Sequence, residues 1–107
     1  MSGFDRRREG FEGKFALDEE TKFKVQARRD KLLGLWAAGQ MGLAGEAAEA
    51  FAREMIKADL AEPGDADLLR AVKQAFAGKG VAITDQQIEE RLRHYQDEAR
   101  RQIAAEG

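Results

Sequence analysis

The 107-residue sequence contains no cysteine, one proline, one histidine and one serine. The absence of cysteine excludes disulfides and thiol chemistry, and it is typical of proteins of a reducing compartment. A catalytic Ser/His/Asp set is not expected, because His94 is the only histidine and Ser2 lies at the very start of the chain. A metal site is not expected either, since His94 has only the carboxylates of a solvated helix face near it. These absences favour a binding protein over an enzyme.

Long apolar runs are also absent. The longest, residues 32–39, is far shorter than the ~20 residues that a membrane-spanning helix needs. The charged N-terminus has no apolar segment of the kind found in secretory signals. The sequence therefore predicts a cytoplasmic protein without membrane insertion.

Charge is abundant but nearly balanced, with a formal net charge of −2 and 36% charged residues. Residues 1–31 carry nine Lys/Arg against seven Asp/Glu, whereas residues 32–107 carry nine against thirteen. The basic excess thus lies at the N-terminal end. This interspersed pattern is typical of a soluble surface and not of a nucleic-acid-binding face.

Helical periodicity dominates the chain from about residue 17, and no segment alternates like a strand. We predict an all-α protein whose helices cover residues 17–38, 45–61, about 66–78 and about 85–106, with short connections. A compact four-helix bundle over residues 17–107 follows, and the free chain is expected to be a monomer. No internal repeat or low-complexity tract is present.

Local signals place the helix ends. Gly39 is predicted to end the first helix with a positive φ, and Asp65 to cap the third. Thr84 and Gln87 form a capping box for the fourth. The glycines around Lys79 are assigned to a turn, because a phosphate-binding loop pattern is missing.

Apolar spacing also predicts the buried faces. We expect inward-facing residues at Ala16, Phe23, Ala27 and Gly34, then at Ala48, Phe51, Ala52, Met55 and Leu60, then at Leu68, Leu69, Val72 and Phe76, and finally at Ile88, Leu92, Tyr95, Ala99 and Ile103. Trp36, in the apolar stretch, is predicted to be a core anchor.

The first fifteen residues differ from this pattern. Phe4, Phe11 and Phe15 recur among charges and glycines, and in a helix they would lie within roughly 40° of one another. The stripe lies about 80–100° from the predicted first core face. Gly10 and Gly13 each cost about 1 kcal/mol in a helix, so we predict that residues 1–16 are a mobile arm that folds on a partner.

Three segments carry a resemblance to a known family: residues 11–18 (FEGKFALD), residues 23–39 (FKVQARRDKLLGLWAAG) and residues 62–67 (EPGDAD). They resemble the bacterial zeta subunit, the ATPase-inhibitor subunit of the F-type ATP synthase. The similarity covers nearly the whole chain and is most specific over residues 27–38. That block usually has asparagine where this chain has Asp30, a departure that concerns the bundle more than the arm.

The resemblance implies a function and a set of partner-binding residues. The arm would enter an interface between the alpha and beta subunits, become helical and reach towards the gamma shaft, which would arrest ATP hydrolysis. The inhibitory positions implied are Phe4, Asp5, Arg6, Arg7, Arg8, Glu9, Phe11, Glu12, Lys14 and Phe15. Burying three phenylalanines, at about 1.5–3 kcal/mol each, outweighs an ordering cost of about 2–5 kcal/mol.

Two other functions stay open. One is a small helical nucleotide-binding sensor that binds ATP or ADP weakly, with Lys79, Arg91 and Arg93 as candidate phosphate contacts and no other cofactor. The other is a generic helical adaptor that recognises a different protein through the arm. A structural alternative is that the aromatic residues of the arm fold back onto the bundle.

Overall fold

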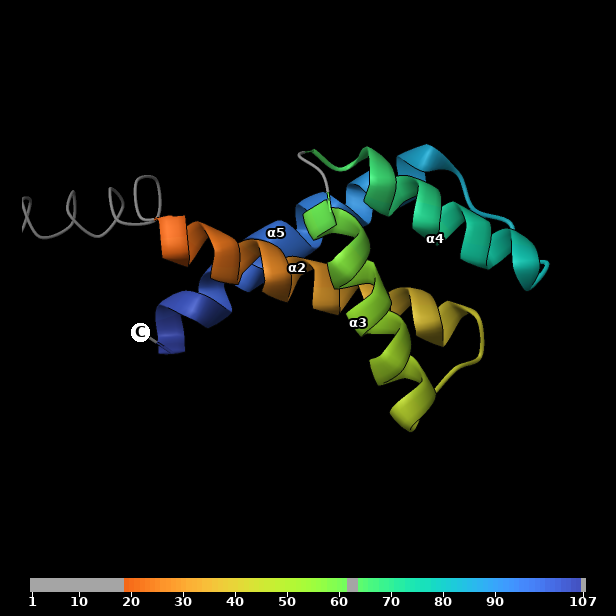
Figure 1. Cartoon of the computed structure of the whole chain (residues 1–107), viewed down its shortest axis with the longest axis horizontal. Helices are drawn as coiled ribbons and strands as arrows, with labels where there is room; N and C mark the ends of the chain where they lie inside the picture. The colour runs from red at the N-terminus through yellow and green to blue at the C-terminus, as the bar shows by residue number, and fades with distance from the viewer. Residues whose placement is uncertain (1–18, 62–63, 107) are drawn as a thin grey trace, which may run out of the picture.

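A computed structural model describes residues 19–61 and 64–106 of the chain. These residues form four helices: α2 (Glu19–Gln40), α3 (Gly45–Ala61), α4 (Ala66–Gly78) and α5 (Asp85–Glu106) (Figure 1). The all-α four-helix fold is thereby confirmed. None of the helices in these two ranges is both long and apolar enough to cross a membrane.

Helix α2 is the centre of the arrangement, since it packs against both α3 and α5. Helix α3 crosses α2 steeply (Figure 1). Helix α4 packs against α3 and also contacts α5. Residue 19, where the described chain begins, therefore starts the helix against which α3 and α5 pack.

A single apolar cluster fills the interior. Its buried members come from all four helices: Leu33, Ala37, Met55, Leu68, Val72, Phe76, Ile88 and Leu92. The amphipathic spacing of α4 and α5 explains their part of it, because residues three and four apart lie on one face of a helix. Most of the predicted inward positions of α3, α4 and α5 are confirmed as buried or as packed against this cluster.

The predicted inward face of early α2 is wrong. Phe23 has 55% of its surface exposed, Ala27 is only partly buried, and Thr21, Val25 and Arg29 are buried instead. Leu60 of α3 is also 39% exposed, and its neighbour Asp59 takes the inner position. The predicted angle of 80–100° between the aromatic stripe and the core face is therefore wrong, because Phe23 and Ala27 do not form that face. Gly34 is buried as predicted.

The predicted helix ends are correct in part. Thr84 and Gln87 form the predicted capping box: Gln87 N–H donates to Thr84 Oγ1 at 3.1 Å and Thr84 N–H to Gln87 Oε1 at 2.9 Å. Gly39 is not the terminating residue; α2 continues to Gln40, and Gly42 takes the positive φ of 81°. Asp65 stands at the predicted cap of α4, but its side chain makes no capping hydrogen bond.

Candidate functional site

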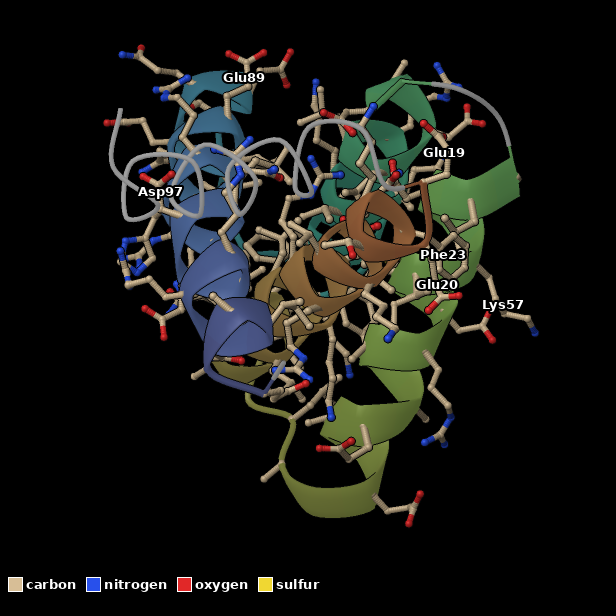
Figure 2. All side chains as sticks on the ribbon, turned by 90° about the vertical axis from the view of Figure 1, so that its left-hand side faces the viewer. Glu19, Glu20, Phe23, Lys57, Glu89 and Asp97 are labelled. Carbon is tan, nitrogen blue, oxygen red and sulfur yellow. The ribbon has the colours of Figure 1, made fainter. Side chains whose placement is uncertain are left out.

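The predicted inhibitory arm, residues 1–16, lies outside the described residues, and so do all ten of its implied partner-binding positions. What the structure describes is the helix that the arm leads into. The first turns of α2 expose Glu19, Glu20 and Phe23 on one face of the molecule, together with Lys57 of α3 (Figure 2). Ion pairs join Glu19 to Lys22 at 3.4 Å and Glu20 to Lys24 at 3.5 Å, which suits acidic groups at a helix start.

A buried arginine near the middle of α2 fastens this helix to the bundle. The Arg29 guanidinium donates from Nε to Asp30 Oδ1 at 2.9 Å, and from Nη2 to Asp59 Oδ2 at 3.0 Å and Asp65 Oδ1 at 2.9 Å. Gln26 Nε2 also donates to Asp59 Oδ2, at 2.6 Å. One side chain thus links α2, α3 and the turn before α4, which is why Asp65 is not free to cap α4. We call Arg29, Asp30, Asp59 and Asp65 the Arg29 junction.

Two carboxyl groups of the Arg29 junction are almost fully buried, Asp30 and Asp59. Burial, together with the neighbouring Asp59, raises the pKa of Asp30 to about 9, although the Arg29 guanidinium acts to lower it. Burial also acts to raise the pKa of Asp59, but its interaction with Asp30, the hydrogen bond from Gln26 and the positive charge of Arg29 together lower that pKa. Asp30 Oδ2 and Asp59 Oδ1 are buried and have no hydrogen-bond partner among the described residues. With its pKa raised to about 9, Asp30 is protonated at neutral pH, so the pair of Asp30 and Asp59 carries a single negative charge.

At the other end of α2, Trp36 borders a hollow of about 550 Å³ between α2, α4 and α5. Its ring lies 6.2 Å from that of Phe76, and the Arg91 guanidinium sits 5.1 Å from the ring centroid. Trp36 packs against the core but is only partly buried, so the prediction of a core anchor is only partly correct. Because Arg91 already covers its face, the indole offers little free surface for stacking a ligand.

The three predicted phosphate contacts are not gathered at one place. Arg91 lines the Trp36 hollow beside Glu90. Arg93 lines a second hollow, of about 430 Å³, whose other charged residues are Arg29, Asp65, Glu89 and Asp97. Lys79 is exposed at the end of α4 and lines neither hollow. The carboxylates beside Arg91 and Arg93 disfavour a phosphate group, since like charges repel at short range.

In the described part of the chain, no three or more of His, Asp and Glu come together in a way that could hold a metal ion. His94 is exposed and its ring packs edge-on against Tyr95, with centroids 5.0 Å apart. The sequence analysis missed the Arg29 junction. A signal was present, because Arg29, Asp30 and Asp59 interrupt apolar helical faces, but charged residues on helices are usually exposed.

Comparison with known proteins gives the family. The model of the family described as ATPase inhibitor subunit zeta matches residues 1–102. A solved solution NMR structure is similar to this chain with a TM-score of 0.71 and 35% sequence identity, over 80% of this chain and 98% of that one. No match was found among curated proteins. The chain belongs to the family of the ATPase inhibitor subunit zeta.

Proposed function

We propose that this protein inhibits ATP hydrolysis by the F-type ATP synthase, inserting residues 1–16 at an alpha/beta catalytic interface towards gamma. The observation that carries the proposal is the family match, which begins at residue 1 and so includes the segment with Phe4, Phe11 and Phe15. The protein acts by binding and not by catalysis. Its partners are the alpha, beta and gamma subunits, and it works in the cytoplasm at the head of the synthase.

The physical basis is the contrast between the two parts of the chain. Residues 19–106 supply a helical body with its own apolar core, whereas Phe4, Phe11 and Phe15 supply apolar side chains among charges. Arg6, Arg7 and Arg8 would add charge-assisted hydrogen bonds to carboxylates of the partner. Phenylalanine and arginine are both enriched in the cores of protein interfaces.

The decisive experiment is an ATP hydrolysis assay on the purified synthase head with and without the protein. Saturable inhibition is expected, and a variant lacking residues 2–15 is expected to lose it. Unchanged hydrolysis at saturating protein would refute the proposal. Saturable amide shifts with ATP around Trp36, without inhibition, would instead indicate the nucleotide sensor; recovery of no synthase subunit in a pull-down would favour the adaptor.

A further inference from the structure

Helix α5 carries a row of charged residues on the side that faces solvent. At about 100° per residue, four exposed residues of both signs lie within roughly 80° of one another: Glu90, Arg93, Asp97 and Arg100. The row points about 140° away from the face of α5 that buries Ile88, Leu92 and Ala99. In Figure 2, α5 forms an outer edge of the described bundle, with Glu89 and Asp97 along it. We call Glu90, Arg93, Asp97 and Arg100 the α5 charge row.

Other charged side chains of α5 have partners. Asp85 pairs with Lys73 at 2.8 Å, and Glu98 pairs with Arg101 at 2.6 Å. Within residues 19–61 and 64–106, by contrast, no ion pair involves a member of the α5 charge row. The row therefore offers charges of both signs that the described chain leaves unpaired.

The order of the signs indicates which partner fits the row. Along the helix it alternates between acid and base, and it is symmetric in position about Tyr95. Glu90 and Arg100 lie five residues to either side of Tyr95, and Arg93 and Asp97 lie two residues to either side. A second α5 placed antiparallel, with a two-fold axis at residue 95, therefore sets Glu90 opposite Arg100 and Arg93 opposite Asp97. In such an isologous dimer each contact occurs twice.

Other placements of two α5 helices bring like charges together. Parallel helices in the same register set every charged residue opposite its own copy. Sliding the antiparallel pair by three residues, about one turn, sets Arg93 opposite Arg100 or Glu90 opposite Asp97. Like charges placed opposite each other oppose association. The α5 charge row thus specifies one direction and one register.

We propose that the α5 charge row is a self-association surface, through which two copies of this chain pair antiparallel about residue 95. This inference is independent of the proposed function. Exposed ion pairs are individually weak and are screened by salt. The dimer therefore forms at high protein concentration and low ionic strength, and the dilute protein is a monomer.

Charge exchange tests the pairing. An acidic variant combines Arg93→Glu with Arg100→Glu, and a basic variant combines Glu90→Arg with Asp97→Arg. In sedimentation equilibrium at low salt, the dissociation constant of each variant alone is expected to rise at least tenfold over that of the wild type, because each row now repels its own copy. An equimolar mixture of the two variants is expected to associate at least as tightly as the wild type, which also shows that both variants are folded.

The matched control combines Lys31→Glu with Lys79→Glu. These exposed residues lie outside α5, and their substitution changes the net charge by the same amount as in the acidic variant. The control is expected to associate nearly as tightly as the wild type. Equal weakening in the control would mean that net charge, and not the α5 charge row, governs association.

Chemical crosslinking tests the direction of the helices, since the chain itself has no cysteine. Gln86 and Ala104 lie nine residues to either side of residue 95 and on the same side of α5 as the charge row. A mixture of Gln86→Cys and Ala104→Cys proteins is expected to form a heterodimer with a short bismaleimide reagent. Gln86→Cys alone is not, because the two copies of residue 86 would lie roughly 27 Å apart.

Contrary results overturn the proposal in different ways. A wild type that stays monomeric at high concentration and low salt would show that the row pairs with no second copy. Unchanged association of the acidic and basic variants would assign the dimer to another surface, and crosslinking of Gln86→Cys alone would indicate parallel helices. Loss of association on removal of residues 2–15 would show that this segment, and not a second α5, provides the contact.

Discussion

Gly34 of α2 meets Ala52 of α3 so closely that a β-carbon built on Gly34 would lie 2.7 Å from the Cα of Ala52 and 3.1 Å from its Cβ. The contact involves backbone, which cannot rotate away. Two small residues therefore set the distance between these helices at their crossing. The steep approach of α3 to α2 in Figure 1 depends on this pair.

Substitution of Gly34 by alanine is expected to destabilise the fold by about 1–3 kcal/mol, because the new methyl group forces the two helices apart. Alanine is a better helix former than glycine. A loss of stability would therefore show that the close contact with Ala52 outweighs the gain in helix propensity. Gly39→Ala is the control: nothing lies within 4 Å of a β-carbon there, and a gain of up to about 1 kcal/mol is expected. Urea unfolding of both variants measures the difference, and equal stabilisation would disprove the close contact.

Stability is expected to fall as the pH rises, because folding takes up a proton at Asp30. The folded pKa of about 9 lies above the ordinary value of 3.8. The stabilisation of the folded state by proton uptake at Asp30 is therefore complete below about pH 4 and is lost as the pH rises through about 9. Between pH 5 and 9 the free energy of unfolding should decrease by up to about 1.4 kcal/mol per pH unit. Urea unfolding at pH 5, 7 and 9 measures the slope.

Asp30→Asn tests the origin of that slope. The amide is neutral and has the shape of the protonated carboxyl, but it has no proton to lose. The pH dependence between pH 5 and 9 should flatten in this variant. Asp97→Asn, at an exposed position of α5, should keep the wild-type slope. A wild-type slope in Asp30→Asn would show that another group takes up the proton.

Phe76 and Trp36 pack against each other but differ in burial. We therefore expect them to contribute unequally to the stability of the fold. Phe76 is 1% exposed, so Phe76→Ala should cost about 3–5 kcal/mol. Trp36 is partly exposed, and Trp36→Ala should cost less, about 2 kcal/mol. Thermal unfolding followed by far-UV circular dichroism tests both. The reverse order would mean that Trp36 is the main anchor after all.

Phe11→Ala is expected to weaken inhibition and to leave the stability of the bundle nearly unchanged. Residue 11 precedes the helices that form the described core, and the loss of one buried phenylalanine corresponds to about 1.5–3 kcal/mol of binding. Ser2→Ala serves as the control for a substitution in the same segment. A large drop in the melting temperature of Phe11→Ala would show that this side chain packs on the bundle.

Inhibition itself is expected to be nearly independent of pH from 6.5 to 8. Histidine is the side chain whose charge ordinarily changes near neutrality, and the one histidine, His94, lies on α5. The titration of Asp30 affects inhibition only if unfolded protein accumulates. Inhibition constants of the wild type and of His94→Gln across this range provide the test. A steep dependence that the variant abolishes would contradict the expectation.

Secondary structure was largely predictable from the sequence. Repeats of three and four residues, together with Thr84 and Gln87 as a capping box, are local signals, and the four helices follow them. Local signals failed at the end of α2, where several glycines lie close together. The helix continues two residues past the predicted end, to Gln40, so that Met41 packs against the core and Gly42, not Gly39, takes the positive φ.

The faces of α2 were less predictable, because its two halves bury different sides. Apolar residues surround the helix near Leu33, and the early half buries Arg29 with its acidic partners. A pattern of apolar residues alone selects Phe23 over Arg29. At about 100° per residue, Arg29 and Leu33 point within about 40° of the directions of Phe4, Phe11 and Phe15, whereas Val25 points up to about 80° away.

The place of Arg29 in the chain has a mechanical consequence. A rotating partner that gripped residues 1–16 would pull on α2 from its first residue. Within about 15 Å of Glu19, Arg29 holds this helix to α3 and to the turn before α4, and Arg28 holds it to Gln102 and Glu106 of α5 at 2.7 Å each. Tension on the helix would thus be divided among three segments before it reached the apolar core, so the bundle would resist being unravelled from the end that is pulled.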